Sequence, residues 1–174
     1  MIDPYHFISY FGFTASEVKA LCDRFEINIE EARNWYNGYF VELNQPIYNP
    51  TSVTNYLRRQ KIGNYWNRTE TYEALKDYIV FDFDGLQNKF ARLIAGEQLN
   101  INPDKFSNDM STFNSTDDVL TLLVHLGYLS YCWEKRKVRI PNEEVKREFI
   151  NSIEDLDSWD TVVKAINDSR SLTI

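Results

Sequence analysis

Asp82 and Asp84 stand one residue apart in the string VFDFDG (80–85), a spacing that can serve phosphoryl transfer. In phosphatases that form an aspartyl-phosphate, one aspartate of such a loop attacks phosphorus and the next acts as a general acid, with Mg²⁺ beside both. That chemistry requires a loop at the end of a parallel strand. Here Leu86 stands where Thr or Ser is expected, and the flanking residues favour helices. We therefore expect a loop in which Asp84 caps the following helix.

Glu144 and Lys146 form the E-x-K half of a restriction-type nuclease site. In such a site both side chains share one face of a β-strand and act with an upstream metal-binding aspartate. Asn142, however, is a good helix N-cap, and a helix places residues i and i+2 about 200° apart. The pattern therefore predicts a solvated helix face, with no catalytic role for these residues.

Cysteine and histidine are too sparse for a metal site or a disulfide scaffold. Cys22 and Cys132 lie far apart in the chain, and the histidines are His6 and His125. Because His125 falls in an apolar run, we expect a hydrogen-bonded core histidine. With six glycines, the chain has no glycine-rich phosphate loop and none of the common nucleotide-binding or hydrolase motifs. We expect no catalytic residue, metal or cofactor in this chain alone.

Basic residues gather near the tip of a predicted β-hairpin, at Lys135, Arg136, Lys137 and Arg139. Such hairpins often contact nucleic-acid phosphates without reading bases. Against this, residues 106–174 hold 8 basic and 12 acidic side chains, a net charge of −4. Two roles stay open for this basic cluster: a nucleic-acid contact, or a solvated or protein-contacting turn. The acidic surroundings favour the second.

Helix signals dominate the elements that must position these residues. Thr14-Ala-Ser-Glu17 is a capping box, and Asn49-Pro50 places a good N-cap before a proline at the first helical position. Capping and apolar periodicity predict helices over 14–25, 28–36, from 50 onward, 70–79, 86–95, 115–126, 143–153 and 158–167. The run GYFVELNQPIYNP favours a small hairpin or an irregular loop. Strand-like runs at 128–133 and 137–140 predict a β-hairpin.

The order of these elements predicts a mainly α fold with two domains. Residues 1–105 form a helical bundle, and residues 106–174 form a winged-helix domain with one small β-hairpin and a C-terminal helix. The 174 residues are 43% hydrophobic and 15% aromatic with a net charge of −7, which suits a folded chain. No apolar run approaches the roughly 20 residues that span a bilayer, so we expect a soluble, cytoplasmic protein without a membrane partner.

A series of strings in this order resembles a known family. They are YFGFTASEVKALC (10–22), WYNGY (35–39), IYNPTSVTNYL (47–57), YWNRTETYEALKD (65–77), GLQNKFARLIAGE (85–97), FSNDMSTFNSTDDVLTLLVHLGYLSY (106–131) and IPNEEVKREFI (140–150). The chain resembles the C-terminal part of the bacterial AAA-ATPase-like family, whose members usually continue into a PD-(D/E)XK nuclease-like domain. The resemblance covers about residues 5–155. It rests on the number of ordered strings, none of which is catalytic.

The resemblance implies that residues 1–105 are the helical lid of the ATPase and that residues 106–155 are its winged helix. It also implies that ATP and Mg²⁺ bind an N-terminal ATPase core outside this chain, and that a nuclease-like domain follows it. We therefore expect this chain to be a fragment that lacks both partners. Tyr48, Asn49 and Ser52 match a turn that lies by the adenine in related ATPases, so the resemblance implies that they are close to the nucleotide.

The chain departs from the family pattern at WYNGYF (35–40), where the family more often has WYDGYRF. Asn37 and Phe40 thus replace an acid and an arginine at a position for an arginine sensor of γ-phosphate. The function that the resemblance implies is a non-catalytic lid and winged helix that couple nucleotide state to the nuclease-like domain. The alternative is a winged-helix module that binds nucleic acid or protein through its basic hairpin.

Overall fold

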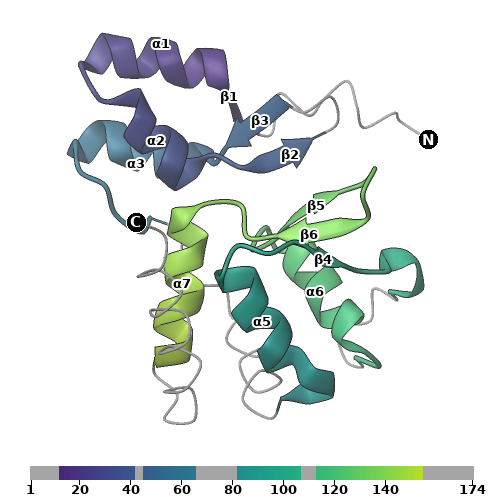
Figure 1. Cartoon of the computed structure of the whole chain (residues 1–174). Helices are drawn as coiled ribbons and strands as arrows, with labels where there is room; N and C mark the ends of the chain where they lie inside the picture. The colour runs from purple at the N-terminus through teal and green to yellow at the C-terminus, as the bar shows by residue number, and fades with distance from the viewer. Residues whose placement is uncertain (1–11, 42–44, 66–81, 107–112, 155–174) are drawn as a thin grey trace. The chain divides into compact units, whose positions relative to one another are not determined.

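The computed structural model describes residues 12–41, 45–65, 82–106 and 113–154 (Figure 1). By its internal contacts the chain divides into two compact units. The first comprises Met1–Asn67 and Pro141–Val145, and the second comprises Arg68–Ile140 and Lys146–Ile174. The helices predicted over 70–79 and 158–167 lie outside the described residues.

Among its described residues, the first unit contains three complete helices, the start of α7 and a small antiparallel sheet. The helices are α1 (Ala15–Phe25), α2 (Ile29–Tyr36) and α3 (Pro50–Arg59). The strands are β1 (Phe13–Thr14), β2 (Tyr39–Val41) and β3 (Gln45–Tyr48), in the order β1-β3-β2. Phe13 lies opposite Tyr48, and Tyr39 lies opposite Ile47. The antiparallel pairing of β2 with β3 supports the hairpin, one of the two structures predicted for the run after α2.

Side-chain caps start the helices of the first unit. The capping box of α1 is formed as predicted: Thr14 Oγ1 accepts from the Glu17 amide at 3.3 Å, and Glu17 Oε2 accepts from the Thr14 amide at 2.8 Å. Asn28 Oδ1 accepts from the Glu30 amide at 2.9 Å at the start of α2. These bonds satisfy amides that have no partner within a helix.

The core of the first unit combines aliphatic side chains with tyrosines whose hydroxyls have partners. The rings of Tyr36 and Tyr56 lie 5.5 Å apart, and the Tyr56 hydroxyl donates to Glu31 Oε2 at 2.7 Å. α2 and α3 are thereby joined by ring packing and by a hydrogen bond. The core cluster consists of Val18, Cys22, Ala32, Tyr36, Tyr48, Val53, Tyr56 and Leu57.

The second unit has a different order of elements. It contains the short 3₁₀ turns η4 (Phe83–Gly85) and η5 (Pro103–Lys105) and the helices α5 (Leu86–Ile94) and α6 (Thr116–His125). Its strands are β4 (Leu99–Asn100), β5 (Ser130–Cys132) and β6 (Lys137–Arg139), all antiparallel, with β6 between β4 and β5. Helix α7 (Glu143–Glu154) begins with residues of the first unit and continues with residues of the second.

Helix α6 supplies much of the core of the second unit. Val119, Leu120 and Leu123 are fully buried, as the nearly continuous apolar run predicts. Phe149 of α7 packs against Phe90, with ring centroids 5.2 Å apart, and against Tyr128 at 6.1 Å. These three aromatic rings thus form part of the interior of this unit.

The mainly helical fold with small antiparallel sheets is confirmed. Where sequence analysis expected one β-hairpin in the second half, β4 adds a third strand, with Leu99 opposite Val138. A two-residue strand carries no readable alternation, so its sequence did not reveal it. The predicted boundary near residue 105 differs from the division by contacts and stays a prediction. Among the described residues, no helix has both the length and the apolarity needed to cross a membrane.

Candidate functional site

The side chain of Glu144, at the start of α7, is completely buried. Its Oε2 atom accepts a hydrogen bond from Ser52 Oγ at 2.7 Å, and its Oε1 atom accepts one from the Tyr65 amide at 2.6 Å. The expectation of a solvated helix face is therefore wrong for this residue. The helix itself forms as predicted, but residues 141–145 pack within the first unit. We call Ser52, Tyr65 and Glu144 the Glu144 clasp.

Tyr36 holds the segment that contains the Tyr65 amide, one of the two hydrogen-bond donors to Glu144. Its hydroxyl donates to the carbonyl oxygen of Gly63 and accepts from the Gly63 amide, both at 3.1 Å. The rings of Tyr36 and Tyr65 lie 6.1 Å apart. Burial raises the pKa of Tyr36 to about 12, and the negative charge of Glu144 adds to the shift. The phenol therefore stays protonated and can donate over the whole physiological pH range.

The chain before Glu144 approaches the backbone after α2 very closely. Gly38 has φ +115°, and a Cβ atom placed there would lie 1.9 Å from the carbonyl oxygen of Pro141. Glycine is thus required both for its backbone conformation and for this contact. Asn142 Oδ1 accepts from the Val145 amide at 3.0 Å, which confirms Asn142 as a cap of α7.

Each residue predicted to lie near a nucleotide has a structural partner. Asn49 Oδ1 accepts from the amides of Thr51 and Ser52 at 2.9 and 3.2 Å, so it caps α3 as the Asn-Pro pair indicates. Tyr48 ends β3 and is 1% exposed. Ser52 is fully buried and donates to Glu144. The structure brings the three together at the start of α3, and their contact with a nucleotide stays a prediction.

The predicted basic cluster lies on the β5–β6 hairpin, where its members differ in exposure. Lys135 is exposed in the turn, and Lys137 and Arg139 are half-buried in β6. Arg136 has φ +51°, and its guanidinium donates to the carboxylate of Asp104. Burial lowers the pKa of Arg139. The hairpin therefore presents less exposed positive charge than its sequence indicates.

Trp133 stands beside these residues and is 68% exposed. Its ring meets the ring of Tyr131 edge-on, with centroids 4.9 Å apart and an interplanar angle of 83°. A large aromatic side chain that is exposed and held by a neighbour can serve as a contact surface. For the aromatic cluster Tyr128, Tyr131 and Trp133 the sequence predicts core packing, with a binding cleft as the alternative, and for Trp133 the prediction of core packing is wrong.

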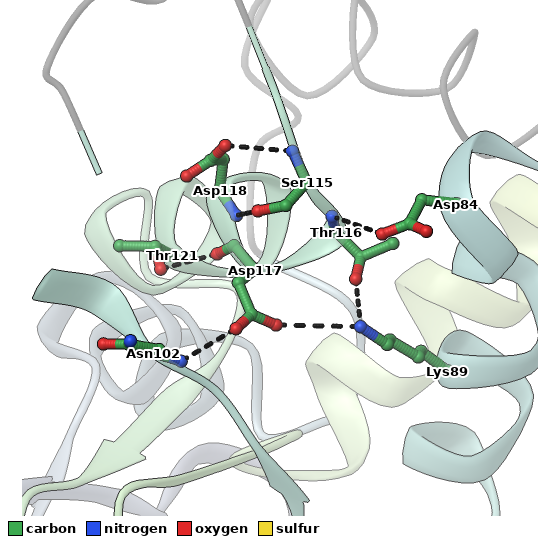
Figure 2. Close-up of polar contacts among 8 residues, drawn as sticks. All are labelled: Asp84, Lys89, Asn102, Ser115, Thr116, Asp117, Asp118 and Thr121. Carbon is green, nitrogen blue, oxygen red and sulfur yellow. Dashed lines mark hydrogen bonds and ion pairs between the residues drawn. The ribbon is translucent and has the colours of Figure 1, made fainter. Parts of the chain in front are cut away.

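A polar network surrounds the start of α6 (Figure 2). Asp84 Oδ2 accepts from the Thr116 amide at 3.3 Å. Lys89 donates to the Thr116 hydroxyl and lies 3.6 Å from Asp117 Oδ1. Asp117 Oδ2 accepts in turn from the Asn102 amide at 3.0 Å. The network joins α5, the segment after β4, and α6. The carboxylates of Asp84 and Asp117 both take part in hydrogen bonds within the protein.

Asp82 and Asp84, the acidic pair in VFDFDG, both accept hydrogen bonds from helix amides. The N-cap of α5 is Gly85, so Asp84 does not cap this helix as predicted; Asp82 Oδ1 accepts from the Gln87 amide in its first turn at 2.9 Å. Both aspartates have left-handed backbone conformations, with φ +48° and +50°. The tight double turn directs Asp84 toward Thr116 instead of toward α5. The two carboxylates therefore bind amides of two different helices.

His125 is exposed at the end of α6, so the expectation of a core histidine is wrong. Its ring stacks on Phe106, with centroids 5.5 Å apart and an interplanar angle of 22°. Within the described ranges, no group of three or more His, Cys, Asp or Glu side chains is placed to hold a metal ion. No family model, curated protein or solved structure matches this chain.

Proposed function

We propose that this chain is the non-catalytic lid and winged-helix portion of an AAA-ATPase-like protein. In this role it couples the nucleotide state of an ATPase core, which binds ATP and Mg²⁺, to a neighbouring nuclease-like domain. The observation that carries the proposal is the Ser52–Glu144 hydrogen bond, which joins the start of α3 to the start of α7. The predicted nucleotide-proximal turn is thus bonded to a helix 92 positions further along the chain.

The second unit supports the winged-helix part of the proposal. Its described elements follow the order helix, strand, helix, strand, strand, and the last strand pairs between the other two. That arrangement is the one expected of a winged helix with the β5–β6 hairpin as its wing. α6 is buried on most sides, which suits a helix that supports the wing more than one that enters a nucleic-acid groove.

The arrangement of the polar residues supports a non-catalytic role. Asp82 and Asp84 accept from helix amides, and Glu144 accepts from Ser52 and Tyr65. A general acid or nucleophile must reach a substrate, whereas the Ser52 and Glu144 side chains are fully buried. In a lid, such groups act by setting which conformation is populated.

The experiment compares ATP turnover and binding by the 174-residue chain with those of the product of its complete reading frame. We expect no turnover and at most feeble binding of a fluorescent ATP analogue by the chain alone, because a lid supplies only part of a nucleotide site. The complete product should bind and hydrolyse ATP. Robust hydrolysis by the isolated chain, or none by the complete product, would contradict the proposal.

A second candidate function is binding of nucleic acid or protein through the β5–β6 hairpin. The exposed ring of Trp133, held by Tyr131 beside exposed Lys135, favours it. Aromatic stacking and lysine contacts are sequence-tolerant ways to hold a single strand. The ion pair of Arg136 with Asp104 weighs against a strong phosphate site. Retention of nucleic acid that falls steeply with salt is the property that distinguishes this candidate.

A further inference from the structure

We infer that the Glu144 clasp is a releasable contact that holds residues 141–145 on the first unit and opens without unfolding that unit. The inference rests on the proposed function in one respect: the lid role makes the clasp the element through which the start of α3 acts on α7. Ser52 is then a positioning residue that acts through Glu144, and not a nucleotide contact. Its hydroxyl is buried and donates to the carboxylate.

The geometry joins three segments at one carboxylate. Ser52 belongs to the first turn of α3, Tyr65 follows α3, and Glu144 begins α7. Each carboxylate oxygen accepts from a different one of the other two segments. A shift of either donor therefore changes the bonding of the start of α7 directly.

A buried carboxylate such as that of Glu144 is a costly choice if its only role is to fill space in the interior. Burying a carboxylate carries a large desolvation cost, and an apolar side chain of similar volume is often as stabilising or more so. What a buried charged contact provides is specificity, because it is favourable only when all its donors are in place. A contact with these properties distinguishes sharply between a docked and an undocked segment.

Most of the core of the first unit comes from segments other than residues 141–145, although Tyr65 of the clasp packs against it. The buried cluster is formed by residues of α1, α2, α3 and the end of β3, and it includes no residue of 141–145. In the docked segment, Glu144 is hydrogen-bonded to Ser52, Pro141 lies against Gly38, and Val145 is fully buried. Loss of the clasp should therefore release the segment locally and leave the cluster intact.

Hydrogen exchange of the intact 174-residue chain without nucleotide tests this inference, with Ser52→Ala and Glu144→Ala as the disruptive variants. Thr54→Ala, exposed on the same helix as Ser52, and Glu134→Gln, exposed in the β5–β6 turn, are the matched controls. We expect exchange at 61–65 and 141–147 to rise about tenfold or more in both disruptive variants, since each removes a hydrogen bond of the buried Glu144 carboxylate. Exchange in α1 should not change.

Glu144→Gln separates hydrogen bonding from charge. Its amide can accept from the Tyr65 amide and donate to Ser52 Oγ, so it should restore most of the protection that Glu144→Ala loses. Exchange that rises equally in α1 and in 141–147 would show a purely structural role, and unchanged exchange at 141–147 in Ser52→Ala would show that no clasp exists. Either result overturns the inference. Failure of the proposed function would appear separately, as absent ATP binding by the complete product.

Discussion

At the scale of single residues, buried polar side chains form the hydrogen bonds that connect distant segments of this protein. Ser52, Tyr36 and Glu144 are each less than 1% exposed, and each has a hydrogen-bonding partner from another segment. None of these contacts is local in sequence, so the residue types alone indicated ordinary helix surface or core. The closest sequence signal was the E-x-K pattern, which identified Glu144 for a different chemical reason.

A substitution at Gly38 tests the close approach between Gly38 and the carbonyl oxygen of Pro141. Gly38→Ala places a methyl group against the Pro141 carbonyl and in an unfavourable backbone conformation, so we expect a loss of about 2 kcal/mol or more in the free energy of unfolding. Gly96→Ala is the matched control, because Gly96 also has a positive φ, +96°, but has no atom within 4 Å of the added Cβ. Urea denaturation followed by circular dichroism measures both. Equal losses would show that the Pro141 contact contributes nothing.

At the scale of elements, local signals predicted the helices of the described residues well. Thr14, Asn49 and Asn142 each cap the helix that their sequence context indicated, and the β5–β6 hairpin lies where two apolar runs flank a charged turn. Helix starts are readable because the cap and its amides lie within three residues of each other. The pairing of β4 with β6 and the docking of residues 141–145 depend on distant partners, and no local pattern encodes them.

The start of α3 gives a prediction at this scale. Asn49→Ala removes the acceptor for the amides of Thr51 and Ser52, so we expect a loss of about 1 kcal/mol in stability. Asn49→Ser should recover most of that loss, because serine is also a good N-cap. Thermal unfolding of the two variants beside Thr54→Ala measures the effect. A stability of Asn49→Ala equal to that of the control would show that the cap is dispensable.

At the scale of the whole molecule, the chain consists of two compact units with different sheets and different cores. Residues 141–145 belong to the first unit although the residues on either side belong to the second. Glu144, the acceptor of the Glu144 clasp, lies in that short segment, at the start of α7, whose residues are divided between the two units. Under the proposed function, the segment is where a change near Tyr48, Asn49 and Ser52 would reach α7.

Hydrogen exchange at residues 141–147 with and without ATP, in the product of the complete reading frame, tests this coupling most directly. We expect ATP to change exchange there in the wild type and in Thr54→Ala. Ser52→Ala should abolish the change, because it removes the bond between the start of α3 and Glu144. We predict both this nucleotide dependence and its loss in Ser52→Ala. Exchange at 141–147 that is identical with and without ATP in the wild type would contradict it.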